Sequence, residues 1–405
     1  MSRRATGPAS GTPSVVYVLP DKMGGVATIV ANLLGSRRPD GLAYHAVLTR
    51  NRPDPDTRYG GVLPADGQRV VEYSLPPENL FAVLRRLASS LPPGPGVLVA
   101  NDWIELAMLS VHDPGRTVIQ ILHGDHEYYY DLARRHEAVI DVFVTYGRVM
   151  DDKLRRLLPH RREHIVHLPY GIPLPPRGRA PAPGPLRLLF AGRLSDRQKG
   201  VFDLLRIDEL LGAAGISVRW TVAGDGVDGP ALRQRWRAGD RVVWVGARSH
   251  AEVAALLPEH DVFVLPTRAE GVPVALVEAM AAGVVPVASD IPSGVAELVE
   301  PGRTGLLAPV ADVAAFAAAI ASLARDPDRL EAMSRRAREV VGAAHDVRER
   351  TAAYQALYAR WAELGRRPAG RAPLGYGSRL DQPWLPNGAV VAVRRAWRLL
   401  GGRIR

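Results

Sequence analysis

The sequence contains no cysteine, which excludes disulfide bonds, thiol catalysis and metal sites built from thiolates. This composition fits a reducing compartment. No apolar run approaches the length of a membrane-spanning helix, so we expect none. Residues 1–13 carry Arg3 and Arg4 but no apolar core. We therefore expect a disordered start there and not a signal peptide.

The first 365 residues carry almost no net charge. The whole chain has a net charge of +10, but residues 366–405 hold nine arginines and one aspartate and so carry +8 of it. The remaining +2 argues against a broad surface for nucleic acid, and we expect no nucleic-acid partner. The excess charge instead predicts a basic tail.

A length of 405 residues, of which 47% are hydrophobic, is enough for two cores. Short β-rich runs alternate with helical segments, which is typical of an α/β fold. The first half predicts strands at 14–19, 44–48, 97–100, 118–122, 139–145 and 165–168, and helices at 25–34, 80–91 and 147–157. The second half predicts strands at 186–191, 217–223, 242–245, 262–265, 284–288 and 305–307, and helices at 200–214, 251–257, 274–282, 310–325 and 329–341. The two halves therefore predict two similar sheets.

A proline-rich stretch at 173–185 separates the two halves, and it suits neither a helix nor a central strand. We interpret it as a linker between domains. The predicted organisation is a start at 1–13, an N-terminal domain at 14–172, the linker at 173–185, a C-terminal domain at 186–345, a helix at 346–364 that returns to the N-terminal domain, and a tail at 365–405.

Two glutamates, Glu270 and Glu278, flank an apolar segment in the C-terminal half. Glu270 follows a predicted strand, and Glu278 lies about two turns into the next predicted helix, so both point toward the loop end of a parallel sheet. Each carboxylate can accept hydrogen bonds from a pair of neighbouring hydroxyls. The pattern therefore suits a sugar or a ribose.

A loop with two cations, Arg193 and Lys199, joins another predicted strand to its helix, and Gly192 and Gly200 allow the loop to bend. Cations beside a helix N-terminus favour an anion. A solvated basic loop is the alternative, and the glutamates on neighbouring strand ends favour the anion site. Gly246 ends a further strand, where backbone groups could meet a nucleotide base.

His123 follows a predicted strand and precedes Gly124. A lone histidine is more often structural than catalytic, but its place at a strand end favours a functional role. The residues that follow, His126, Glu127 and 128–130, either line an acceptor site or form a polar loop with an aromatic anchor.

Taken in order, several motifs resemble those of the retaining glycosyltransferases of family 4, over about residues 14–361. They are Gly24-Gly25, His123-Gly124, Gly171-Ile172, Gly192-Arg193, Lys199-Gly200, Gly224-Asp225-Gly226, Val245-Gly246, Glu270 to Glu278, Ala281-Ala282-Gly283 and Gly302 to Gly305. The resemblance implies the GT-B architecture, in which two Rossmann-like domains face each other across a cleft. It also implies a nucleotide-sugar donor, transfer without a metal, and retention of the anomeric configuration.

The resemblance also implies roles for individual residues. Arg193 and Lys199 would hold the donor diphosphate, Glu278 the ribose, and Gly25 would bring its amide toward the diphosphate. Glu270 and the turn Gly271-Val272-Pro273 would contact the donor sugar, with His123 near the transferred sugar. The sequence departs from the family at Pro273 and Ala275, where glycine and proline are usual.

We therefore expect an enzyme, a metal-independent retaining glycosyltransferase of the hexosyltransferase type. It would move a sugar from a nucleotide-diphosphate sugar to a glycan, a lipid-linked acceptor or a small molecule. No cofactor beyond this co-substrate is expected. The alternatives are a nucleotide-sugar epimerase of GT-B fold and a non-catalytic nucleotide-sugar-binding protein. A dinucleotide oxidoreductase is disfavoured, because no Gly-x-Gly-x-x-Gly pattern follows the first strand.

The tail predicts a short amphipathic helix at 388–405. Its apolar positions repeat at spacings of three and four: Val390, Val393, Trp397, Leu400 and Ile404. We expect Arg394, Arg398 and Arg405 on the flank. The helix either lies on an anionic membrane or docks on protein. The expected location is the cytoplasm, where the tail could bring the protein to the inner membrane face.

Overall fold

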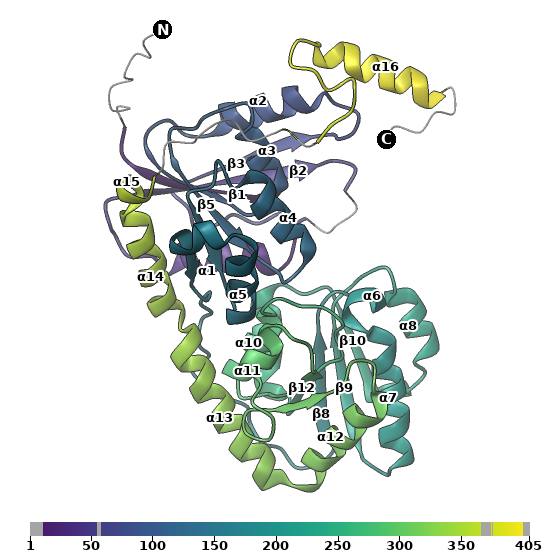
Figure 1. Cartoon of the computed structure of the whole chain (residues 1–405). Helices are drawn as coiled ribbons and strands as arrows, with labels where there is room; N and C mark the ends of the chain where they lie inside the picture. Colours follow the sequence, from purple (N-terminus) through teal and green to yellow (C-terminus); the bar gives the residue numbers. More distant parts are fainter. Residues whose placement is uncertain (1–10, 55–57, 366–373, 375, 400–405) are drawn as a thin grey trace.

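The computed structural model describes residues 11–54, 58–365, 374 and 376–399. Most of the predicted start at 1–13 and several predicted tail positions, among them Leu400, Ile404 and Arg405, lie outside the described residues. Two parallel sheets organise the chain, one in each half (Figure 1).

The N-terminal sheet has the strand order β3-β2-β1-β4-β5-β6-β7, and every pair in it is parallel. Its strands are β1 (Ser14–Pro20), β2 (Ala43–Asn51), β3 (Gly67–Tyr73), β4 (Gly96–Ala100), β5 (Thr117–Leu122), β6 (Val142–Thr145) and β7 (Ile165–His167). Its helices are α1 (Gly25–Gly35), α2 (Leu80–Ser90), α3 (Trp103–Met108), α4 (Glu127–His136) and α5 (Arg148–Leu157).

The C-terminal sheet has the order β10-β9-β8-β11-β12-β13 and is also parallel. Its strands are β8 (Leu186–Ala191), β9 (Val218–Ala223), β10 (Val242–Gly246), β11 (Val262–Leu265), β12 (Val285–Ser289) and β13 (Leu306–Ala308). Its helices are α6 (Asp196–Lys199), α7 (Val201–Ala213), α8 (Gly229–Arg235), α9 (His250–Leu256), α10 (Val274–Ala281), α11 (Gly294–Leu298), α12 (Val313–Arg325) and α13 (Pro327–His345). The two parallel α/β domains confirm the predicted fold class.

Alternating side chains along each strand pack into layers of helices on both faces of the sheet. In β1, Val15, Tyr17 and Leu19 face one core, while Val16 and Val18 face the other, as the two-residue repeat of a strand requires. The core that contains Tyr17 continues through α10 and β11 into the C-terminal domain. One hydrophobic core therefore joins the two domains.

In both sheets the strand order reverses direction near the middle, between β1 and β4 and between β8 and β11. Ligands of open parallel sheets bind beyond the carboxyl ends of the strands at such a reversal. The loops at these ends meet between the domains. A Cβ on Gly271, after β11, would lie 2.8 Å from the Cα of Gly124, after β5.

The chain returns to the N-terminal domain through α13 and α14 (Val347–Ala359), followed by α15 (Trp361–Leu364) (Figure 1). The Tyr358 hydroxyl lies 2.9 Å from that of Tyr17, and the Tyr354 hydroxyl donates to the Leu168 carbonyl at 2.9 Å. Both tyrosines of α14 are buried. Helix α14 is therefore an integral layer of the N-terminal domain.

Several elements were not anticipated. β3 is an edge strand with a polar, partly exposed sequence, and α3, α4, α8 and α11 are short or polar. The segment that begins His126-Glu127 is not a loop, because residues 127–136 form α4. Helix α13 begins at Pro327, two residues before the predicted start, because the Asp326 side chain caps it. No helix in the described ranges has the apolar length needed to cross a bilayer.

The tail docks on the N-terminal domain through α16 (Asn387–Leu399), shown in yellow in Figure 1. The prediction that Arg394 lies on the flank of this helix is wrong. Its side chain is 2% exposed and pairs with Asp381 at 2.8 Å. The guanidinium is buried because it donates hydrogen bonds to the carbonyl groups of Pro76 and Glu78 in the neighbouring loop. Val393 and Trp397, predicted on the apolar stripe, are 52% and 53% exposed.

Candidate active site

Three glycines lie at the carboxyl ends of neighbouring strands of the C-terminal sheet, where they expose backbone groups. Gly192 follows β8, Gly224 follows β9, and Gly246 is the last residue of β10. The amide of Gly224 donates to the Gly246 carbonyl at 2.8 Å, and a Cβ on Gly224 would lie 1.9 Å from the Gly192 carbonyl oxygen. Gly224 also has φ +144°, so a larger residue is excluded by both space and backbone conformation. Backbone groups, without side chains, are therefore presented at this sheet edge.

The loop that carries Arg193 and Lys199 contains α6, a single helical turn that is followed by Gly200. Gly200 adopts the left-handed conformation, φ 61° and ψ 37°, so that α7 begins directly after α6. A Cβ there would lie 2.2 Å from the Pro266 carbonyl oxygen. This close packing places Lys199 beside the end of β11, while Arg193 is exposed at the end of β8.

Lys199 reaches Glu270, with which it forms a close ion pair between Nζ and Oε1. The Thr267 hydroxyl donates to the same oxygen at 2.9 Å. The side chains of Lys199 and Glu270 are 15% and 8% exposed, so the pair lies mostly out of water. The structure thus brings together two predicted site residues that are 71 positions apart, and Thr267 is a partner that the sequence analysis missed.

Glu278 projects from α10 with a side chain that is only 10% exposed. Its Oε1 lies 3.3 Å from Nδ1 of His250, while its Oε2 is buried and has no hydrogen-bond partner among the described residues. Leaving a buried acceptor unsatisfied costs about 1–3 kcal/mol, and more if it is charged. This oxygen is therefore ready to accept hydrogen bonds from a ligand.

His250 was not predicted from the sequence. It is the first residue of α9, which Ser249 and Glu252 cap reciprocally. The Ser-x-x-Glu spacing is visible in the sequence and could have placed His250 at a helix start. Its pairing with Glu278 depends on the neighbouring α10 and leaves no local signal.

Two helix N-termini from different domains converge near these groups. A Cβ on Gly25, the first residue of α1, would lie 3.3 Å from Cγ2 of Val274, the first residue of α10. Neither first turn contains an acidic residue, and neither helix has a side-chain cap. Their dipoles and unsatisfied amides both favour an anion at this place.

His123 directly follows β5, and both of its ring nitrogens contact other side chains of the protein. Nε2 lies 2.8 Å from Oδ1 of Asn101, and Nδ1 lies 3.2 Å from the Tyr146 hydroxyl. Burial lowers the pKa of His123 from 6.5 to about 3, so the ring is neutral at pH 7. Because Asn101 Oδ1 can only accept, Nε2 carries the proton and Nδ1 accepts from Tyr146. Asn101 and Tyr146 were not predicted.

Tyr170 connects the last part of the N-terminal domain to the turn after Glu270. Its hydroxyl donates to the Val272 carbonyl at 3.1 Å, and its ring packs against Tyr146 at 5.1 Å. Burial first, and then the charges of Glu278 and Glu270, raise the pKa of Tyr170. Both predicted carboxylates therefore act on this one buried hydroxyl.

A further contact between the domains involves Glu297 on α11. Its two oxygens accept from the amides of Arg148 and Val149, each at 2.8 Å. These amides belong to the first turn of α5, where a carboxylate is favoured by the helix dipole. The C-terminal domain therefore caps a helix of the N-terminal domain.

No group of three or more histidine, aspartate or glutamate side chains suited to a metal is found in the described part of the chain. The positive groups of the site are instead Arg193, Lys199 and the two helix N-termini.

Two Rossmann-like domains, joined at the carboxyl ends of their strands and crossed by a returning C-terminal helix, define the GT-B architecture. Solved glycosyltransferases have the same fold. A sucrose-phosphate synthase from Thermosynechococcus elongatus superposes with a TM-score of 0.68, at 20% identity, over 86% of this chain and 98% of that one. The HepE protein of Anabaena, solved with UDP and glucose, gives a TM-score of 0.69 at 17% identity, over 85% of this chain and 99% of that one.

Residues 185–326, which lie almost entirely within the C-terminal domain, match the family described as glycosyl transferases group 1. Among curated relatives, the WcaL protein of Salmonella typhimurium, whose name assigns it to colanic acid biosynthesis as a glycosyltransferase, is 39% identical over 171 residues. That match covers 40% of this chain and only 42% of the relative. The glycogen synthase of Mycobacterium tuberculosis is 29% identical over 72% of this chain and 75% of its own length.

Proposed function

We propose that this protein is a retaining glycosyltransferase that moves a sugar from a nucleoside-diphosphate sugar to an acceptor hydroxyl. The observation that carries the proposal is the buried Oε2 of Glu278, which has no hydrogen-bond partner among the described residues and lies in the domain that holds the Lys199–Glu270 pair. A ribose supplies hydroxyl donors for such an oxygen, and a diphosphate supplies charge for the cations. HepE, a neighbour by fold, was solved with UDP and with UDP-glucose, which supports a donor of this class.

In this proposal Arg193, Lys199 and the N-termini of α1 and α10 bind the donor diphosphate and stabilise the charge that develops on it. One oriented donor at such a position is worth about 3–4 kcal/mol of barrier in other enzymes. The leaving group would therefore not need a metal. Gly192 and Gly246 would let the nucleotide approach the strand ends, because they carry no side chain.

The donor sugar would lie against Glu270 and the turn Gly271-Val272-Pro273. Glu270 would use the oxygen that Lys199 does not engage. Retention would follow from attack on the face that the phosphate leaves. The bond from the anomeric carbon to the phosphate oxygen breaks, the acceptor oxygen bonds to that carbon on the same side, and the acceptor proton passes to the phosphate.

His123 would take part as a neutral group. Since Asn101 and Tyr146 hold both of its nitrogens, a hydroxyl of the transferred sugar would have to replace one of these contacts or meet its backbone carbonyl. That carbonyl would lie 3.3 Å from a Cβ on Gly271 and so already faces the turn after Glu270.

The acceptor would approach from the N-terminal domain, at the carboxyl ends of β1 and β4. Asp102 lies there as the cap of α3 and accepts from the Tyr128 hydroxyl. A glycan, a lipid-linked sugar or a small molecule could each supply the acceptor hydroxyl. We further propose a cytoplasmic location, which the absence of cysteine fits, with reversible association at the inner membrane face.

A donor screen tests this function. Thermal unfolding is followed with a panel of UDP-, GDP- and ADP-sugars, because a specific donor at about 100 times its Kd stabilises the fold by about 2.7 kcal/mol. The stabilising donor is then incubated with candidate acceptors in excess chelator, and the anomeric configuration of the product is determined by NMR. Conversion of the donor to its epimer would indicate an epimerase, and stabilisation without turnover would indicate a binding protein. An inverted product or a strict metal requirement would contradict the proposal.

A further inference from the structure

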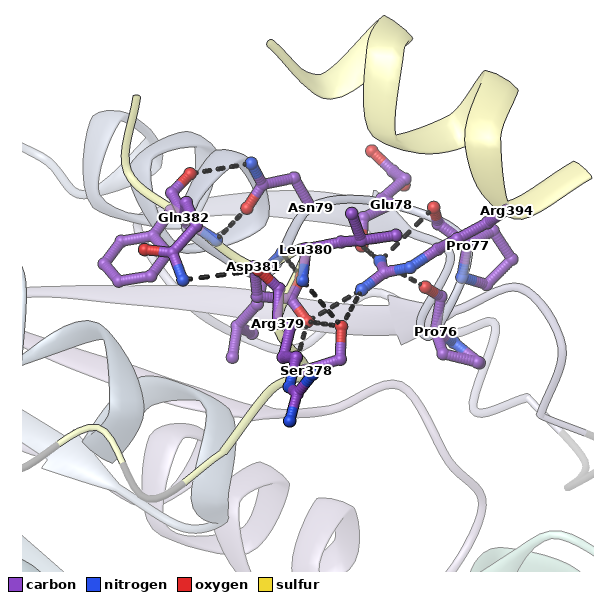
Figure 2. A network of polar contacts seen from close by, with 12 residues as sticks. Pro76, Pro77, Glu78, Asn79, Ser378, Arg379, Leu380, Asp381, Gln382 and Arg394 are labelled. Carbon is purple, nitrogen blue, oxygen red and sulfur yellow. Dashed lines mark hydrogen bonds and ion pairs between the residues drawn. The ribbon is translucent and has the colours of Figure 1, made fainter. Parts of the chain in front are cut away.

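The tail is fastened to the N-terminal domain by a buried polar network (Figure 2). Arg394 donates to the carbonyls of Pro76 and Glu78, both at 2.6 Å, and pairs with Asp381 at 2.8 Å. Asp381 in turn accepts from the amide of Leu80 at 2.7 Å. Both terminal nitrogens of Arg394 have partners in this network, although its buried Nε has none among the described residues, and the network holds α16 in one place on the domain.

A second anchor precedes the network. The ring of Tyr376 packs against Trp103 at 4.9 Å and stacks on His136 at 6.0 Å, with the guanidinium of Arg135 over it at 5.0 Å. Residues on both sides of the loop that leads into α16 are therefore fixed. The helix is presented on the side of the N-terminal domain that is remote from the C-terminal domain (Figure 1).

The domain covers only the beginning of the apolar stripe of α16, which consists of Val390, Val393 and Trp397. Val390 is 1% exposed, whereas Val393 and Trp397, one and two turns further along, are 52% and 53% exposed. The stripe thus continues beyond the surface that buries its first residue.

Tryptophan exposure points to the same segment. The chain has seven tryptophans, and the two that are largely exposed, Trp384 at 73% and Trp397 at 53%, both belong to the tail. Tryptophan is favoured where an apolar body meets a polar boundary, as at the headgroup level of a bilayer.

The charge around the stripe is positive. Arg395 and Arg398 are exposed on the last turns of α16, and residues 366–405 together carry +8 of the net charge of +10. The described helix contains no acidic residue. A surface with exposed tryptophan, aliphatic side chains and arginine is complementary to an anionic lipid bilayer, in which apolar groups enter the boundary and cations meet the headgroups.

We propose that α16 is a preformed docking surface for anionic membranes, with Val393 and Trp397 entering the headgroup boundary together with Trp384 of the preceding segment, and with Arg398 on the flank binding lipid phosphates. The surface acts independently of sugar transfer, so its failure would not bear on the enzymatic proposal. Because the helix is already folded and anchored through Arg394, binding would not have to supply the ordering of the helix.

Vesicle co-sedimentation of the full chain tests the proposal. Vesicles of phosphatidylcholine with 30% phosphatidylglycerol are compared with pure phosphatidylcholine at low and high salt. We expect binding to the anionic vesicles that falls with salt. Trp384→Ser with Trp397→Ser should lower the partition coefficient at least tenfold at unchanged charge, and Arg398→Gln should lower it about fivefold.

Matched controls are available elsewhere on the surface. Val62→Ser and Val227→Ser remove aliphatic groups that are each 85% exposed, and Arg335→Gln removes an exposed cation of α13. These variants should bind like the unchanged protein, and all variants should keep its melting temperature.

Equal binding by the tail variants and the controls, or no binding to anionic vesicles, would overturn the proposal. So would equal binding to neutral vesicles. Sedimentation velocity provides a separate check. A dimer that Trp397→Ser dissociates, without any vesicle binding, would assign the stripe to a second copy of the chain.

Discussion

Replacement of Glu278 by glutamine tests the ribose site most directly. The substitution keeps the shape of the side chain and removes its charge. In the unliganded protein the Oε2 atom has no partner among the described residues, and the amide oxygen of glutamine can keep the contact with His250, so we expect no loss of thermal stability. If Glu278 were important only to the fold, the substitution would instead lower the melting temperature.

The expected loss of affinity can be worked from hydrogen-bond energies. A bond to a charged acceptor contributes about 1.5–3 kcal/mol and a neutral one about 0.5–1.5 kcal/mol. For two ribose hydroxyls the difference is about 2–3 kcal/mol, or about 30- to 150-fold in Kd. Glutamine also turns an amide donor toward one hydroxyl, which favours the upper part of this range.

Titration calorimetry with UDP, GDP and ADP measures the effect on whichever nucleotide binds. Glu209→Gln, an exposed glutamate on α7 in the same domain, serves as the control for the loss of one charge. An unchanged Kd for Glu278→Gln would refute the reasoning. An equal loss for both variants would also refute it, because the effect would then come from net charge.

Three other perturbations have expected outcomes. Lys199→Ala should lower turnover about 10²- to 10³-fold by removing a cation from the diphosphate site, and it should also lower the melting temperature, because Glu270 stays buried without its partner. The double variant Lys199→Ala/Glu270→Gln should recover the melting temperature but not the activity, and recovery of both would contradict the role of Lys199. Glu297→Ala should enlarge the radius of gyration measured by small-angle scattering, because the amides of α5 lose their acceptor, and an unchanged profile would count against an interdomain latch. Burial and then Arg135 lower the pKa of His136 from 6.5 to about 4, so its contribution to stability is complete above pH 6.5 and is lost as the pH falls toward 4. His136→Phe should flatten the plot of unfolding free energy, measured with urea, against pH between these values, whereas His112→Phe at an exposed site should not. The same pH dependence in His136→Phe as in the unchanged protein would contradict the assignment.

The elements that the sequence predicts well are those with a strong local pattern. β1, β8 and β11 are runs of apolar residues bounded by turn residues, and their observed limits lie within one residue of the predicted ones. β3 was missed because an edge strand with three polar residues among seven carries no such run. α4 was missed because consecutive tyrosines and a polar composition hide its buried face.

The candidate site shows the same division between local and distant information. The glycines, Lys199 and Glu278 can be found from spacing, because each is fixed by a turn or a helix beside it in the chain. Their partners cannot be found in this way. His250 reaches Glu278 from a different loop, and Tyr170 reaches Val272 across 102 positions. Such pairings are set by the packing of the two domains.

In the tail, the amphipathic pattern correctly predicts a helix but not which of its side chains are buried. The spacing of Val390, Val393 and Trp397 does predict the helix. It does not reveal that Arg394 is the buried residue, because the carbonyls that bind its guanidinium belong to residues 76 and 78, more than 300 positions earlier. A charged residue on an amphipathic helix can therefore be an anchor when the surface beneath it is polar.

The turn after Glu270 belongs both to the proposed sugar site and to the contact between the domains. Donor binding and domain contact should therefore be coupled. Through Glu270 it belongs to the proposed sugar site, while Val272 accepts a hydrogen bond from Tyr170 and Gly271 lies against Gly124. A ligand that reorients this turn would change both contacts to the N-terminal domain. Conversely, opening of the domains would remove the groups that hold the turn in place. Since α1 and α10 also meet at this point, the proposed diphosphate site is complete only when the domains are together.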